Sequence, residues 1–150
     1  MKRAPDLFSL LAIIVLFCCP AKAGTDFGTD EEADAMATRV IAMLDSAGLP
    51  ATIEALFDPN LPFAASPLGI NLFSGSVVVG DNREPEMVEA DYSKNRDLTG
   101  KLFWPLVDAA ADNREYIVLK WYHYDTQEVY DYHCLCARAE NRDHTIMICR

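Results

Sequence analysis

Apolar residues recur at helical intervals in the first part of the chain after residue 28. They follow Thr29 and Glu32, which have the spacing of an N-terminal capping box. The apolar positions that share one helix face are Ala33, Met36, Ala37, Val40, Ile41 and Leu44. We therefore predict an amphipathic helix over residues 30–46. Gly48 should end this helix, and Pro50, which suits a first helical turn, should open a shorter one that reaches residue 57.

The rest of the chain has the short apolar runs and turn residues that are typical of strands. Strands are predicted at residues 69–73, 76–79, 116–124, 128–138 and 145–149. A third helix is predicted over residues 102–110, with Pro105 in its first turn. Short polar connections should join the last three strands as antiparallel hairpins. Helices first and a strand meander last indicate an α+β fold rather than a parallel α/β fold.

Residues 80–101 form a long polar segment that is rich in turn-forming residues. A stretch of this length inside a compact domain is usually either functional or poorly ordered. We therefore mark this segment as a candidate binding loop.

The first 23 residues have the layout of a secretory signal. Lys2 and Arg3 precede an apolar run over residues 7–19, and an Ala-Lys-Ala cleavage signal ends at Ala23. An uncleaved membrane anchor is the rival interpretation. However, the 13 apolar residues span only about 20 Å as a helix, which is less than the roughly 30 Å of a hydrocarbon core.

A lipoprotein signal is the other alternative for this leader, with Cys18 or Cys19 as the acylated residue. It is disfavoured because bulky Leu16 and Phe17 precede these cysteines. We therefore predict a signal peptide over residues 1–23 and one domain over residues 24–150, which begins at Gly24. The expected location is periplasmic or secreted, without a stable membrane anchor. Since no signalling domain is expected after this domain, it should act through another protein.

The charge balance excludes several classes of partner. The chain has 13 Lys and Arg residues against 23 Asp and Glu residues, a net charge of −10. The leader holds three of the basic residues and one of the acidic residues, so the exported domain has a charge of −12. This excess of carboxylates repels phosphate groups and anionic lipids, and it argues against nucleic acid as a partner.

Three cysteines remain after the leader: Cys134, Cys136 and Cys149. Export delivers them to an oxidising compartment, where disulfides form and persist. The hairpin that turns near residues 141–142 brings Cys149 close to residue 133 or 134 on the neighbouring strand. We therefore predict a Cys134–Cys149 disulfide, with Cys136–Cys149 as the alternative.

The preceding hairpin has a tyrosine-rich face. If it turns about Thr126, residues whose numbers add up to about 252 lie opposite each other. The side chains that then share one face are Tyr116, Val118, Lys120, Tyr122, Tyr130, Tyr132, Cys134 and Cys136. A lysine between aromatic rings can hold a carboxylate, and tyrosine hydroxyls can add hydrogen bonds. The alternative is that tyrosine merely favours strands and that the lysine is solvated.

The other face of this hairpin should be apolar. It would carry Ile117, Leu119, Trp121, Val129 and Leu135, and we expect it to pack on the helix of residues 30–46. This assignment depends on the register, because a slip of one residue exchanges the two faces.

Neither a metal site nor a catalytic site is predicted. Strand alternation directs His133 away from Cys134 and Cys136, and the chain has no Cys-x-x-Cys or His-x-x-x-His spacing. His123 and Asp125 could belong to a serine triad, but no Gly-x-Ser-x-Gly elbow accompanies them. We therefore expect a protein that is not an enzyme and that needs no cofactor.

The order of several short motifs resembles the single Cache domains, a family of extracytoplasmic ligand-sensing modules of bacteria. The first helix ends in Gly48 as the family's opening helix does, and Phe63 precedes the first strand. Residues 97–101, followed by Phe103, resemble the family's Asp-x-x-Gly-Lys-x-Phe segment. The aromatic strand over residues 116–121 is also similar. The resemblance covers about residues 30–150.

This resemblance implies a PAS-like antiparallel β-sheet with a long N-terminal helix packed across one face. A small-molecule pocket would lie on the other face, roofed by the loop before the middle helix, where Tyr92, Lys94 and Arg96 are candidate contacts. The expected function is non-catalytic binding of a small organic ligand, with a carboxylate as the candidate. A membrane-bound receptor or kinase would be the partner. The alternative is an exported interaction module without a pocket, whose tyrosine-rich surface meets another protein.

Overall fold

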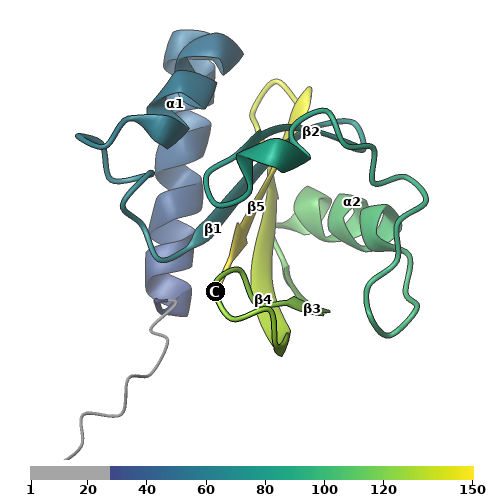
Figure 1. Ribbon diagram of the computed structural model, residues 1–150. Coiled ribbons are helices and arrows are strands. Elements are labelled where there is room, and N and C mark those ends of the chain that lie inside the picture. The colour runs from purple at the N-terminus through teal and green to yellow at the C-terminus, as the bar shows by residue number, and fades with distance from the viewer. Residues whose placement is uncertain (1–27) are drawn as a thin grey trace, which may run out of the picture.

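The computed structural model describes residues 28–150, so the predicted signal peptide and its cleavage site lie outside the described residues. A five-stranded antiparallel sheet separates two α-helices, one on each face (Figure 1). The elements are α1 (Asp30–Phe57), β1 (Gly69–Ser74), β2 (Val77–Asp81), the short 3-10 helix η1 (Pro85–Met87), α2 (Phe103–Asn113), β3 (Tyr116–Tyr122), β4 (Val129–Arg138) and β5 (His144–Cys149). The predicted α+β, PAS-like fold with a long helix across one face is confirmed.

Helix α1 combines the two helices that the sequence predicts. The Thr29 hydroxyl accepts a hydrogen bond from the Glu32 amide at 3.2 Å, and the Glu32 carboxylate accepts one from the Thr29 amide at 2.7 Å. This is the predicted capping box. Gly48 has non-helical dihedral angles with φ at +81°, which divides α1 by a kink just before Pro50. The glycine permits this conformation without steric cost.

The length and hydropathy of α1 would allow it to cross a membrane. In the fold, however, one side of this helix packs against the sheet. Its buried residues are Ala33, Met36, Ala37, Val40, Leu44, Thr52, Ala55 and Leu56. Helix α1 is therefore built as a core helix of the domain.

The strands lie in the order β2-β1-β5-β4-β3. The last strand of the chain is thus the central one, hydrogen-bonded to β1 on one side and to β4 on the other. All five strands and α2 lie within a few residues of the predicted positions. A strand with neighbours on both sides and a helix over each face can be apolar throughout, which is why β5 is buried from Thr145 to Cys149.

The two faces of the sheet build two separate cores. On the α1 side, the packed strand residues are Ile70, Leu72, Leu135, Ile146 and Ile148. On the α2 side, they are Phe73, Val78, Leu119, Tyr132, Cys134, Cys136, Met147 and Cys149. Adjacent residues of one strand belong to different cores because strand side chains alternate between the two faces.

The register of the β3–β4 hairpin differs by one residue from the prediction. Tyr132 pairs with Leu119, and Lys120 pairs with Asp131. The predicted β3 face is therefore exchanged: Leu119 faces the α2 side, whereas Lys120 faces the α1 side. On β4 the prediction was right, because Tyr132 and Cys134 lie on the α2 side.

The geometry of the turn causes this difference. The His123 amide donates to the Glu128 carbonyl at 2.7 Å, and the Gln127 amide donates to the His123 carbonyl at 2.9 Å. Gln127 has a positive φ of 58°. The amides of Asp125 and Thr126 both donate to His123 Nδ1, each at 3.1 Å. A four-residue turn held in this way is centred between two residues rather than on Thr126.

The structure contains the predicted Cys134–Cys149 disulfide, which joins directly opposed residues of β4 and β5 with a Cα–Cα distance of 4.0 Å. Cys136 is a buried free thiol. Burial raises the pKa of Cys136 to about 12, so this thiol stays protonated and unreactive.

Candidate functional site

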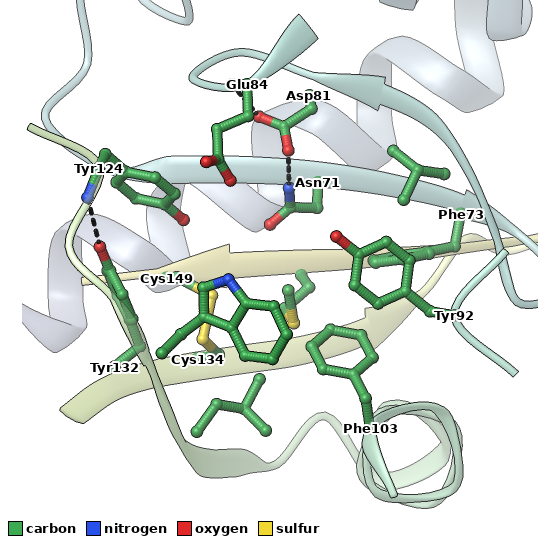
Figure 2. Close-up of a pocket in the computed structure, with 14 residues that line it drawn as sticks. Asn71, Phe73, Asp81, Glu84, Tyr92, Phe103, Tyr124, Tyr132, Cys134 and Cys149 are labelled. Atoms are coloured by element: carbon green, nitrogen blue, oxygen red, sulfur yellow. Dashed lines mark hydrogen bonds between the residues drawn. A yellow bond between two sulfur atoms is a disulfide. The ribbon is translucent and has the colours of Figure 1, made fainter. Parts of the chain in front are cut away.

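A small cavity lies on the face of the sheet opposite α1, below the segment that connects β2 to α2 (Figure 2). Its volume is about 50 Å³. It is lined by Asn71, Phe73, Val78, Asp81, Glu84, Tyr92, Phe103, Leu119, Trp121, Tyr124, Tyr132, Cys134, Met147 and Cys149. A water molecule needs about 10–15 Å³ on this measure, so the cavity has room for roughly three to five waters or one small organic molecule.

Aromatic rings form much of the cavity wall. The rings of Tyr92 and Phe103 lie 4.8 Å apart, and Phe73 meets Tyr92 edge to face at 6.2 Å. Tyr124 and Tyr132 form a second pair with ring centroids 5.0 Å apart. Figure 2 shows these two groups at opposite ends of the site, with the disulfide between them.

Two carboxylates supply the charge of the lining. Asp81 is only 3% exposed, and hydrogen bonds fix its carboxylate in place. Its Oδ2 accepts from Asn71 Nδ2 at 2.5 Å, and its Oδ1 accepts from the amides of Arg83 and Glu84, both at 2.8 Å. Burial raises the pKa of Asp81, although these hydrogen bonds act in the opposite direction.

Glu84 is less restrained than Asp81. Within residues 28–150, its carboxylate has neither a hydrogen bond nor an ion pair. Burial raises the pKa of Glu84, and the charges of Asp81 and Glu86 raise it further. Figure 2 shows the carboxylate directed into the space between Tyr124 and Asn71. Glu84 is therefore an acceptor that is available to a ligand.

The tyrosine hydroxyls of the site stay protonated. Burial, followed by the charges of Glu84 and Asp81, raises the pKa of Tyr92 to about 12. Burial likewise raises the pKa of Tyr132 to about 12 and that of Tyr124 well above its usual value. The Tyr132 hydroxyl accepts from the Tyr124 amide at 3.1 Å.

Two of the tyrosines predicted as ligand contacts, Tyr132 and Tyr92, line this cavity. Tyr130 does not line it but packs behind Tyr132, with ring centroids 4.9 Å apart. Arg96 lies elsewhere, since it is exposed and donates to the Gly100 carbonyl at 2.6 Å. The exposed Lys94 is also absent from the lining.

The three predicted contacts on β3 point to the opposite face of the sheet. Tyr116 donates from its hydroxyl to the Asp30 carbonyl of α1 at 2.9 Å. Lys120 pairs with Asp131 at 2.6 Å on the surface. Tyr122 is 47% exposed. The one-residue difference in register explains all three positions, and it brings Leu119 and Trp121 to the cavity in their place.

Sequence reasoning missed the acidic residues of the site. Asp81 belongs to the turn-rich segment predicted over residues 80–101, and it does cap the turn after β2, but the same carboxylate also lines the cavity. Asn71 was a detectable signal, because it is a polar residue within an otherwise apolar strand. Glu84 had no such signal, since it lies in a segment where polar residues are the rule.

No family model matches the chain, and no curated protein matches it in sequence. Solved structures do match. A methyl-accepting chemotaxis protein from Vibrio parahaemolyticus is 12% identical with a TM-score of 0.63, over 80% of this chain and 86% of that chain. The periplasmic sensor domain of a chemotaxis protein is 16% identical with a TM-score of 0.60, over 80% and 88%.

A third solved structure is a Cache chemosensory domain that was described for its recognition of carboxylic acids. It is 8% identical with a TM-score of 0.59, and the match covers 80% of this chain and 86% of that one. At such low sequence identities these matches establish only the fold, which is that of a Cache domain.

Proposed function

We propose that the protein is an extracytoplasmic sensory module that binds one small organic molecule in the cavity without transforming it. The observation that carries this proposal is the cavity itself, which combines aromatic walls with a few convergent polar groups. Two further points support it. The chemotaxis sensor domains named above share the fold, and the disulfide suits an oxidising compartment.

A binding role fits the lining better than a catalytic one. In the part of the chain that the structure describes, the cavity lining includes no serine, threonine, histidine or lysine, and its two cysteines are joined. Asp81 is already engaged by three hydrogen bonds within the fold, which suits a structural carboxylate rather than a proton-transfer group. Binding would be transmitted through a partner, for which we propose a membrane-bound receptor or kinase.

The proposal is tested by filling the cavity. Leu119 and Val118 are neighbours on β3 that point to opposite faces, the first into the cavity and the second, 48% exposed, to solvent. In a thermal-shift screen of small amines, amino acids, carboxylates and neutral solutes, one class should raise the melting temperature of the wild type and of Val118→Phe. Leu119→Phe should abolish that shift. A shift that survives in Leu119→Phe, or the absence of any shift in the wild type, would refute cavity binding.

A protein-interaction module remains the second candidate because one uncovered sheet surface exposes several large apolar side chains around the Lys120–Asp131 ion pair. The exposed residues there are Tyr116, Val118, Tyr122 and Val129. A flat thermal-shift screen together with co-purification of a protein through this surface would favour that candidate. Introducing a charge into this surface by Val118→Asp should then disrupt the complex.

A further inference from the structure

We propose that the ligand of this cavity is a small organic cation, such as a protonated amine, with Glu84 as its counter-charge. The inference rests on the proposed function and names the chemical class of the ligand. The sequence and the carboxylic acid-binding relative in fold both suggest a carboxylate instead. The groups that surround the cavity argue for the opposite charge.

The charge of the lining is negative. Among residues 28–150, those that line the cavity include Asp81 and Glu84 but neither Lys nor Arg. Lys120, on which the carboxylate prediction depended, is paired with Asp131 on the opposite face of the sheet. An anionic ligand would thus meet two carboxylates without a compensating cation among the described lining residues, which is unfavourable in a partly buried site lined mostly by apolar groups.

Arg83 directly precedes the lining residue Glu84 in the chain, but its side chain interacts with groups other than a ligand. Its Nη2 pairs with Asp125 at 3.2 Å, and its guanidinium lies over the Tyr124 ring at 5.5 Å. Tyr124 itself is part of the cavity wall. The guanidinium is therefore engaged by Asp125 and the Tyr124 ring, and Arg83 does not itself line the cavity.

Glu84 offers the free acceptor that a cation needs. Asp81 already accepts hydrogen bonds on both oxygens, from Asn71 and from two backbone amides. The Glu84 carboxylate has no such partner in the described part of the chain, although it is partly buried. A buried charge without a partner is costly, so an ammonium group placed beside it would relieve that cost.

The aromatic walls suit the rest of such a ligand. Six aromatic side chains line the cavity: Phe73, Tyr92, Phe103, Trp121, Tyr124 and Tyr132. Faces of these rings attract ammonium groups and also pack against their alkyl substituents. A metal ion fits less well, because no group of three His, Cys, Asp or Glu side chains within residues 28–150 could hold one.

The two ligand classes predict opposite pH dependences. An ammonium ligand binds the ionised form of Glu84, so its affinity should fall as the pH is lowered through the raised pKa of this residue. A carboxylate would need the protonated form, so its affinity should rise over the same interval. The charges that act near Glu84 are Asp81 and Glu86, which raise its pKa; Arg83 and the protonated hydroxyls of the wall complete this environment.

The experiment uses three probes with four non-hydrogen atoms each, measured by calorimetric titration of the purified, oxidised protein. Isopropylammonium is the cation, 2-propanol the neutral isostere and acetate the anion. We expect isopropylammonium to bind most tightly near neutral pH. Glu84→Gln should weaken it about tenfold or more, as expected for loss of a charged hydrogen-bond partner, while leaving 2-propanol unchanged.

Glu86→Gln is the matched control. It removes the same charge two residues further along, from an exposed side chain that does not line the cavity, and it should change the affinity for isopropylammonium by less than about twofold because water screens that charge. Equal losses in both variants would overturn the assignment of Glu84.

The remaining outcomes separate this inference from the proposed function. Tight binding of acetate that strengthens as the pH falls, with none for isopropylammonium, overturns the cation proposal but leaves a ligand-binding cavity. If none of the three probes binds and the broader screen is also flat, both proposals fail.

Discussion

The two faces of the sheet use the same strands for different purposes. On the α1 face, branched aliphatic residues such as Ile70, Leu135 and Ile148 are fully packed. On the α2 face, the alternate positions of the same strands hold an amide, rings and sulfur atoms, and they leave a cavity. Strand alternation thus places the fully packed core on one face and the cavity, with the proposed ligand recognition, on the other.

The largest effect is expected from leucine-to-alanine substitutions, whose cost in unfolding free energy should differ between the two faces of the sheet. Leu135, 1% exposed, lies in the α1-side core, and Leu119, 3% exposed, borders the cavity. Leu135→Ala should reduce the free energy of unfolding by about 4 kcal/mol. Leu119→Ala should cost only about 2 kcal/mol, because this side chain already lacks neighbours on its cavity side. Urea denaturation measures both, and equal costs would contradict the proposed difference in packing.

The disulfide is the next largest contribution. It closes a segment with a sequence separation of 15, for which the chain-entropy estimate is about 3 kcal/mol. Replacing Cys134 and Cys149 together by alanine should lower the free energy of unfolding by that amount. Reductant should destabilise the wild type similarly and leave the double variant unaffected. Intact mass should show a gain of about two daltons on reduction of the wild type; no gain would mean that the bridge is absent from the isolated protein.

The ionised carboxylate of Glu84 should lower the stability of the fold by a smaller amount that depends on pH. Because the pKa of Glu84 is raised in the folded state, folding binds protons, and stability is lost as the pH rises through that pKa. Glu84→Gln should therefore stabilise the protein slightly at neutral pH, since water screens part of the unfavourable charge. The gain should disappear once the pH is below the pKa of the unfolded chain. Denaturation curves at neutral and acidic pH test this, and a variant that is less stable at neutral pH would contradict it.

The smallest effect is expected at Lys120, on the uncovered part of the α1 face. Its ion pair with Asp131 is largely exposed, with 38% and 52% of the two side chains accessible. Lys120→Ala should change stability by less than about 0.5 kcal/mol and leave ligand affinity unchanged. A loss of ligand binding in this variant would restore the tyrosine-rich face of β3 as the site, which makes it a direct test of which face recognises the ligand.

Much of the fold could be predicted from local signals. The capping box at Thr29 and the spacing of apolar residues specify α1, and Gly48 marks its kink. The disulfide could be predicted because a hairpin that turns at residues 141–142 places Cys149 beside Cys134. The lining of the candidate site was harder to predict: Tyr132 and Tyr92 were predicted as contacts and line the cavity, whereas Asp81 and Glu84 line it and were not predicted.

The amino-acid sequence by itself determined the elements of this protein, their order and the chemistry available on each strand, because capping, periodicity and turn formation act over a few residues. Only the tertiary structure decided which chemistry faces the cavity. The His123-held turn shifts β3 by one residue and exchanges Lys120 for Leu119, and the pairing of β1 with β2 brings Asn71 beside Asp81. The charge that a ligand meets depends on these long-range pairings, since a strand has two faces and its sequence alone does not say which one is enclosed.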